Sequence, residues 1–268
     1  MRVLGRPLHT EGIDSPRPAS QRAVAFILTA AMLTTLTAPA FAKTWYIEEG
    51  DITISAGKTE GTNKVTQGTT TDEEDTNTTI TNRDKDTPSS NTVTIKAENE
   101  NDKVEVKLED VNIDTSKQSK AAVSVTGKGD TNIELDGDNE LKSGAGHAGL
   151  EHNKTDTSGE LTIQDKDKNG SLEAVGGFKG AGIGSAGSND AQVKITGGNI
   201  TATSDDWGAG IGSGSDGTAY VEITGGEINA TGGYLGAGIG GGCNGSGNVT
   251  ISGGTITAAG SDGAAGIG

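Results

Sequence analysis

The chain has 268 residues, of which 44 are Gly, 31% are hydrophobic and only 3% are aromatic, and its formal net charge is −16. A strongly acidic chain repels the phosphate backbone, which excludes nucleic acid as a partner. A single Cys excludes a disulfide scaffold and any cysteine-based zinc or iron–sulfur site. So few large apolar side chains leave two classes of protein, a disordered acidic chain or a repeat protein with a thin core of small residues.

Residues 1–42 have the layout of a secretory signal peptide. Residues 1–22 are basic, an apolar run follows from Ala23, and Ala40-Phe41-Ala42 forms an A-x-A cleavage site. An N-terminal membrane anchor is the alternative, but the run is shorter than the ~20 residues that a spanning helix needs. The sequence therefore predicts an exported protein, secreted or held at the cell surface, with no membrane segment beyond the signal peptide.

A 28-residue repeat dominates the C-terminal third. Four glycine-rich segments begin 28 residues apart, and Val193, Val221 and Val249 keep the same spacing. The four segments are Gly180-Ala-Gly-Ile-Gly184, Gly208-Ala-Gly-Ile-Gly212, Gly236-Ala-Gly-Ile-Gly240 and Ala264-Ala-Gly-Ile-Gly268. Regular spacing without gaps is the signature of stacked repeats, and it excludes disorder for this region.

Each repeat unit is predicted to contain three short strands. Residues 193–195, 200–202 and 209–211 alternate inward and outward positions with strand period, and glycine-rich turns separate them. No helical periodicity occurs after residue 43. The pattern predicts an all-β fold, a right-handed parallel β-helix of about eight coils. The inward side chains of one regular coil would be Val, Ile, Ile, Ala, Ala and Ile.

Upstream of the regular repeats the pattern is more irregular, and the mature chain is divided into irregular N-terminal coils over 43–103 and a repetitive β-helix over 104–268. In the irregular part, strands are expected at 51–55 and 92–95, and residues 69–88 as a loop or ragged coil around a short strand at 79–80.

The repetitive part departs from a uniform repeat at one insertion and at its C-terminal end. Leu135 aligns with Ile163, 28 positions later, and the 32 positions from Ile163 to Ile195 imply a four-residue insertion at 165–170. The repeat reaches Gly268 without a polar cap, which predicts that the β-helix is truncated there and that any attachment to the cell surface lies beyond it.

The ordered series of segments resembles a known family. Val-Asn-Ile113 and Leu161-Thr-Ile163 precede the iterated Ile-Ser/Thr-Gly-Gly-x-Ile-x-Ala pattern with its Gly-Ala-Gly-Ile-Gly segments. These segments resemble the secreted "carbohydrate-binding domain-containing" glycine-rich parallel β-helix proteins of Gram-positive, clostridial and often gut bacteria. The resemblance runs from Trp45 to Gly268. It implies a β-helix at the cell surface with a polysaccharide or a host or cell-surface glycan as partner, and it supplies no catalytic residues.

Three aromatic residues lie one or two positions before a Gly-Ala-Gly-Ile-Gly segment: Phe178, Trp207 and Tyr234. On a 28-residue coil they stack along one corner, with Phe178 and Tyr234 in register and Trp207 displaced by one. A row of exposed aromatic rings is suited to bind sugars, because the flat apolar face of an aromatic ring matches the C–H face of a pyranose. The alternative is that each ring covers the apolar core at its corner.

A calcium loop is the one cofactor site that the sequence suggests. Asp165, Asp167 and Asn169 follow the first half of the D-x-[DN]-x-[DN]-G pattern of oxygen ligands. The bidentate Glu expected at the twelfth position is replaced by Gly176. The alternative is a solvated acidic turn without metal.

Three classes of function follow. The first is non-catalytic binding of an extracellular polysaccharide, and the second is a structural stalk or adhesin without glycan binding. The third is a pectate-lyase-like enzyme, which would need an Arg or Lys base beside carboxylates. Arg83 is the only Arg after residue 42 and no outward row gathers acids, so the sequence predicts no catalysis. His147 and His152 are expected on the surface, and Cys243 as a free thiol in a turn.

Overall fold

The computed structural model describes residues 42–268. These residues lie in a single compact unit, Phe41–Gly268, which contains both the irregular segment 43–103 and the repetitive segment 104–268. The predicted signal peptide, 1–42, lies outside the described residues except for Ala42. Over the described part of the chain the only helix is a 3₁₀ turn, η1 (Ile47–Glu49), and no helix is long and apolar enough to cross a membrane.

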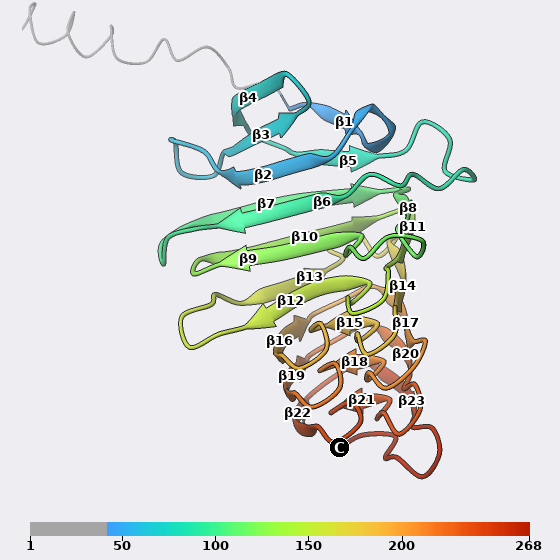
Figure 1. Ribbon diagram of the computed structural model, residues 1–268. Coiled ribbons are helices and arrows are strands. Elements are labelled where there is room, and N and C mark those ends of the chain that lie inside the picture. The colour runs from blue at the N-terminus through green and yellow to red at the C-terminus, as the bar shows by residue number, and fades with distance from the viewer. Residues whose placement is uncertain (1–41) are drawn as a thin grey trace, which may run out of the picture. The chain divides into compact units, whose positions relative to one another are not determined.

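The described chain is a parallel β-helix whose coils have three faces (Figure 1). Eight strands stack in parallel on the first face. They are β1 (Thr44–Tyr46), β5 (Thr79–Thr81), β7 (Lys103–Glu109), β10 (Asp130–Asp136), β13 (Leu161–Gln164), β16 (Asp190–Ile195), β19 (Thr218–Ile223) and β22 (Ser246–Ile251).

The second and third faces are stacked in the same way. The second face holds β8 (Asn112–Asp114), β11 (Asp138–Lys142), β14 (Ser171–Gly176), β17 (Asn199–Ser204), β20 (Glu227–Thr231) and β23 (Thr255–Ala259). The third face holds β2 (Ile52–Ala56), β6 (Val93–Ala97), β9 (Val123–Gly127), β12 (Leu150–Lys154), β15 (Ile183–Gly184), β18 (Ile211–Gly212) and β21 (Ile239–Gly240). From β7 onward five turns have a strand on all three faces, and a sixth, with β22 and β23, reaches the third face through the single bridge between Ile239 and Ile267. Two incomplete levels precede them, so the eight expected coils comprise these six and the two incomplete levels.

The 28-residue register is confirmed in the regular coils. Val193 pairs with Val221, and Val221 with Val249, while Ile200 pairs with Ile228 on the second face. The six inward positions of one coil are buried as expected: Val193, Ile195, Ile200, Ala202, Ala209 and Ile211. The third strand is shorter than predicted, because only Ile211 and Gly212 are in ladder geometry.

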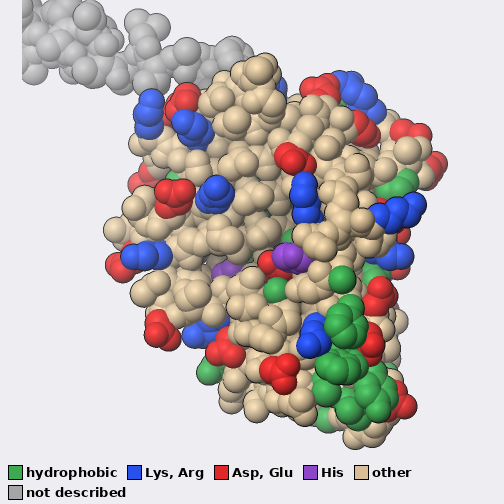
Figure 2. All heavy atoms as spheres, in the orientation of Figure 1, with side chains coloured by type: hydrophobic (Ala, Val, Ile, Leu, Met, Phe, Trp, Pro, Cys, Tyr) green, Lys and Arg blue, Asp and Glu red, His purple; other side chains and the backbone are tan. Residues whose placement is uncertain are grey.

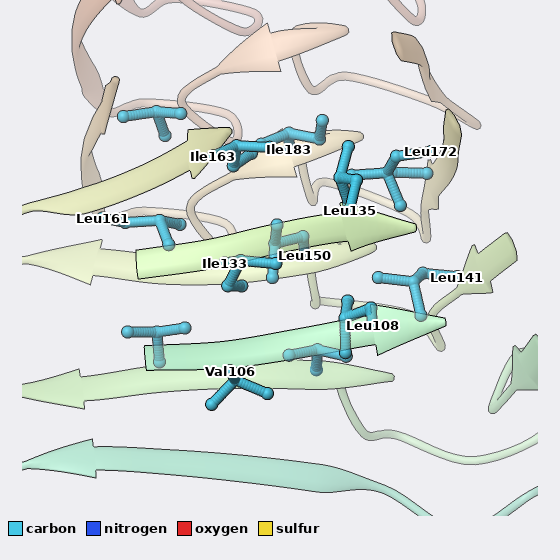
Figure 3. Close-up of a cluster of buried hydrophobic side chains, with 14 of the residues drawn as sticks. Val106, Leu108, Ile133, Leu135, Leu141, Leu150, Leu161, Ile163, Leu172 and Ile183 are labelled. Atoms are coloured by element: carbon cyan, nitrogen blue, oxygen red, sulfur yellow. The ribbon is translucent and has the colours of Figure 1, made fainter. Parts of the chain in front are cut away.

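The earlier coils carry larger inward side chains. Leu108, Leu135 and Leu141 fill the interior together with Ile133 and Leu172, as Figure 3 shows. These residues form one continuous buried cluster with the Ile and Ala rows of the regular coils. Because each coil contributes to a shared apolar column, no single coil needs a large core of its own.

One predicted register is wrong and one insertion is confirmed. Ile163 pairs with Ile133 and not with Leu135, because the chain takes 30 residues for that turn, from Thr131 to Leu161. The four-residue insertion lies where expected. The inward residues Ile163 and Leu172 are nine positions apart, whereas Ile195 and Ile200 are five apart. The extra residues extend the turn between β13 and β14 and leave the strands in register.

The segment 69–88, expected as a loop, contains a strand that closes the N-terminal end of the third face. β3 (Asn63–Gln67) pairs antiparallel with β2, and β4 (Thr70–Asp75) pairs antiparallel with β3. The hairpin covers the free edge of β2, which would otherwise be open to pairing with another chain. We refer to β3 and β4 as the cap hairpin.

A buried hydrogen bond fastens the cap hairpin to the first coil. The indole Nε1 of Trp45 donates to Asp75 Oδ2 at 2.8 Å, and both residues are buried. The other oxygen of Asp75 accepts the backbone N–H groups of Lys43 and Asn77, each at 3.2 Å. The carboxylate therefore joins β1, the end of β4 and the following turn at one point.

At the C-terminal end of the described chain the inward residues are less covered. Val249 and Ile256 are half-buried, whereas their equivalents one coil earlier, Val221 and Ile228, are buried. The outer edges of β22 and β23 pair with no further strand among residues 42–268.

Replacing Asp75 by Ala is expected to lower the free energy of unfolding by about 2–3 kcal/mol, because it leaves the buried Trp45 N–H without an acceptor. Urea denaturation of the wild type and the variant measures the difference. Asp86→Ala, at an exposed position between β5 and β6, is the matched control and should change stability by less than about 0.5 kcal/mol. Equal stability of the two variants would contradict this role of Asp75.

Candidate functional site

The predicted aromatic row lies at the corner between the second and third faces. Phe178 follows β14, Trp207 follows β17 and Tyr234 follows β20. Together with Lys179 and Leu235 these side chains define what we call the aromatic corner. Phe178 is 45% exposed, Tyr234 49% and Leu235 41%, and Trp207 is partly buried. Figure 2 shows apolar side chains gathered over the lower coils on one side of the molecule.

The register within the aromatic corner is as predicted. Lys179, Trp207 and Leu235 are spaced by 28 residues and share a left-handed backbone, with φ of 69°, 63° and 57°. Gly263 continues this row with φ of 90°. Phe178 and Tyr234 precede this row, so Trp207 is displaced from them by one position. A left-handed corner residue in each coil turns the chain from one face to the next.

The rings lie outside the core. None of Phe178, Trp207 and Tyr234 belongs to the buried hydrophobic cluster. The centroids of Phe178 and Trp207 are 5.5 Å apart with their planes tilted by 44°. The Nζ of Lys179 lies 5.0 Å from the centroid of Trp207 and 5.6 Å from that of Phe178. Phe178 and Tyr234 thus leave about half of their surfaces exposed at the corner.

Lys179 is a member of this corner that sequence reasoning missed. Its ammonium forms no ion pair with any described carboxylate and instead faces two rings. The signal was available in the repeat, because Lys179 occupies the position of Trp207 one coil earlier. An ammonium beside two rings adds a hydrogen-bond donor to an otherwise apolar surface.

Large side chains at left-handed positions are costly. A non-Gly residue with φ near +60° costs about 1–2 kcal/mol, and Gly is the residue that fits without cost. Trp207 and Leu235 nevertheless occupy this position, whereas Gly263 shows the unstrained choice in the same row. Ser188, Asp216 and Asn244 form a second left-handed row with φ of 61°, 61° and 59°, so this conformation is a general feature of the corners. The exposure of Phe178 and Tyr234 marks the aromatic corner as the leading candidate site.

The three predicted calcium ligands lie in the turn between β13 and β14. Asp165 uses both carboxylate oxygens within the turn, accepting the N–H of Asn169 and of Gly170 at 3.2 Å each. Asn169 donates its amide to Asp136 Oδ1 at 2.9 Å. Among residues 42–268 no three His, Cys, Asp or Glu side chains converge as metal ligands. Asp165 thus stabilises the turn by itself, and calcium binding stays a prediction.

The two histidines have different surroundings. His147 is partly exposed, and its Nδ1 lies 2.8 Å from Glu151 Oε2. His152 is buried, which contradicts the expectation that it lies on the surface. Its Nδ1 donates to the carbonyl oxygen of Gln192 at 2.9 Å. Burial lowers the pKa of His152, and the hydrogen bond to Gln192 opposes this only in part.

Cys243 is free, as predicted, and it is buried. Its backbone N–H donates to the carbonyl of Trp207 at 2.7 Å. The turn that holds Cys243 therefore supports the strained corner residue from the neighbouring coil.

Comparison with known proteins supports the fold. Three segments, 193–215, 221–243 and 249–268, match the family model of the β-helix repeat. Each begins at the Val of a first-face strand and extends past the second-face strand to the third face, so one match corresponds to one coil. No curated protein and no solved structure matches the chain.

Asp165→Ala tests the turn between β13 and β14. Two backbone N–H groups lose their acceptor, so the free energy of unfolding should fall by about 1 kcal/mol, equally in EDTA and in calcium. Asp167→Ala, which removes a carboxylate that accepts no hydrogen bond from another described residue, is the control and should leave the thermal midpoint unchanged in EDTA. A midpoint that rises with calcium in the wild type, and in neither variant, would instead establish a metal site.

The burial of His152 predicts that the stability of the fold depends on pH. Above its ordinary pKa near 6.5 the residue is neutral in the folded and unfolded chain, and below this value only the unfolded chain readily takes up the proton. Stability should therefore fall as the pH decreases from about 6.5, by at most about 1.4 kcal/mol per pH unit. Urea denaturation of the wild type and His152→Gln measures it, and the two curves should run parallel above about pH 7.5. Parallel curves down to about pH 5.5 would refute this assignment.

Proposed function

We propose that this chain is a non-catalytic, exported β-helix that binds a polysaccharide along the aromatic corner. The observation that carries the proposal is the ring pair of the exposed Phe178 and the half-buried Trp207, with centroids 5.5 Å apart, which the exposed Tyr234 continues along the same corner. Aromatic faces bind the apolar C–H faces of sugars, and an extended row fits a polymer better than a single sugar.

The backbone supports this proposal independently of exposure. Trp207 sits in a left-handed conformation that disfavours a large side chain. Lys179 and Leu235 share this conformation in the neighbouring coils, and Gly263 follows one coil later. The row thus holds the Trp207 ring beside Phe178 and Lys179, outside the buried cluster.

Polar groups beside the rings suit the hydroxyl groups of a sugar. The Lys179 ammonium can donate hydrogen bonds, and the exposed Asp205 and half-buried Asp206 supply carboxylate acceptors next to Trp207. The net charge of −16 disfavours a strongly acidic polymer, since like charges repel. Neutral polysaccharides at a cell surface are thus the favoured partners.

The lysines of the first face support the non-catalytic part of the proposal. A lysine acting as general base needs a pKa lowered toward neutrality. A hydrogen bond from Lys107 to Asp136, at 2.7 Å, raises the pKa of Lys107. The charges of Glu160 and Glu222 raise the pKa of Lys194. Arg83 is paired with Glu49 and stacks on Tyr46.

Export belongs to the proposal because of the signal-peptide pattern over residues 1–42. Nothing in the aromatic corner requires calcium, so the polysaccharide proposal does not depend on Asp165 or Asp167.

Affinity electrophoresis in gels that contain a soluble polysaccharide tests the proposal, with a panel of neutral and acidic polymers. The wild type should be retarded by at least one neutral polymer, and Trp207→Ala should weaken the dissociation constant about tenfold through the loss of one stacked ring. Tyr220→Ala is the matched control, because Tyr220 is 40% exposed but lies on the first face beside Lys154. It should be retarded like the wild type.

The other outcomes separate the alternatives. If no polymer retards the wild type, the stalk or adhesin without glycan binding is favoured. If Trp207→Ala and the wild type are retarded equally, the aromatic corner is not the binding site. Shortening of the polymer during incubation would show catalysis, which the proposal excludes.

A further inference from the structure

A cleft lies on the outer surface of the first face, in the N-terminal half of the described chain. Its volume is about 430 Å³, which is within the range of small-molecule pockets. The floor is formed by outward side chains of β7, β10 and β13, among them Lys107, Asn132 and Gln164. This cleft is separate from the aromatic corner, since no residue of the corner lines it.

The two segments that depart from the regular coil, the cap hairpin and the four-residue insertion, border this cleft on opposite sides. One wall comes from the residues next to the cap hairpin, including Glu60 and Asn77, and the other from Lys166 and Asp167 of the four-residue insertion. In repeat proteins, insertions within the repeats map to loops on one face, which is often the binding face. The cap hairpin and the insertion serve stability in different coils, but they border one cleft.

The amides on the floor have no partners within the chain. Asn132 lies on β10 and Gln164 on the neighbouring β13, where Gln164 pairs with Glu134. Neither side chain forms a hydrogen bond with another described residue. Lys103, which also lines the cleft, forms no ion pair with a described carboxylate. Each free amide group offers a donor and an acceptor to a ligand. The two residues lie in adjacent coils and are offset by two positions, because Asn132 pairs with Thr162 and Gln164 pairs with Glu134.

Glu134 holds the wall in place. Its Oε1 accepts the backbone N–H of Lys166 at 2.6 Å, and its Oε2 lies 3.7 Å from the Lys166 ammonium. These contacts fix the insertion against β10. The pair of Glu134 and Lys166 therefore holds the wall of the cleft in place. The cleft that the amides face is preorganised for a ligand.

The charges of the cleft identify the ligand class. Three lysines, Lys103, Lys107 and Lys166, stand against four carboxylates, those of Glu60, Glu105, Glu134 and Asp167. The net charge of the cleft is −1, so it offers an anion no electrostatic attraction. Val106 is the only residue with a purely apolar side chain in the lining. A neutral, hydroxyl-rich molecule matches such a set of amides, carboxylates and ammonium groups.

We propose that this cleft is a second binding site, which takes one or two neutral sugar units through hydrogen bonds from Asn132 and Gln164. The inference shares only the ligand class with the proposed function, because the residues and the face are different. Sugar recognition here would be polar, whereas at the aromatic corner it would be through ring stacking.

Saturation-transfer difference NMR and calorimetric titration test the cleft. The probes are glucose, galactose, mannose, N-acetylglucosamine, cellobiose and lactose, with glucuronate and galacturonate as acidic counterparts. The wild type should bind at least one neutral sugar. The double variant Asn132→Ala/Gln164→Ala, and Gln164→Ala by itself, should weaken this binding about tenfold or more.

Two controls make the outcomes distinct. Asn248→Ala removes an amide from the first face outside the cleft, and Trp207→Ala removes a ring of the aromatic corner; both should bind the small sugar like the wild type. Absence of binding by all neutral sugars, unchanged binding in the double variant, or stronger binding of the uronates would each overturn the inference. Loss of polymer retardation in Trp207→Ala with small-sugar binding retained would support both sites separately.

Discussion

The parallel ladder between successive coils is the constraint on which the rest of the structure depends. It sets each residue of a regular coil against its equivalent 28 positions later, so every position becomes a row along the molecule. On the third face the backbones of neighbouring coils approach closely. A Cβ on Gly212 would overlap the carbonyl oxygen of Gly240, and Gly184 is held in the same way against Gly212. Gly is required there because neighbouring backbones leave no space for a side chain.

This constraint separates the surface into regions with different freedom. The inward rows must stay apolar and of similar size, and the glycine row of the third face carries no side chain. Variation is left to the outer surface of the first face and to the corners. Both candidate sites lie in these regions, one at a corner where large side chains tolerate a strained backbone, and one between a cap hairpin and a lengthened turn. Function is thus expected at the positions that the ladder leaves free to vary.

Much of the fold could be predicted because the repeat is visible in the sequence. The rows of Val193 and Ile200, the insertion at 165–170 and the displaced Trp207 all follow from spacing alone. The cap hairpin could not be predicted, because β4 is a run of Thr, Asp and Glu whose strand conformation depends on pairing with β3. Burial of His152 depends on a carbonyl 40 residues later in the chain, and the cleft depends on segments that meet only after coiling.

The row that contains Lys179, Trp207, Leu235 and Gly263 has a consequence for ligand length. Three successive coils present a side chain at this row, those of Lys179, Trp207 and Leu235, and successive coils are about 4.8 Å apart. A contact with one ring is weak, but a polymer that reaches several coils gains from the high effective concentration of the next contact. The corner would therefore act as a multivalent array that measures chain length, retaining long glycans and releasing short ones. Its selectivity would grow with the number of coils, without any change in the core.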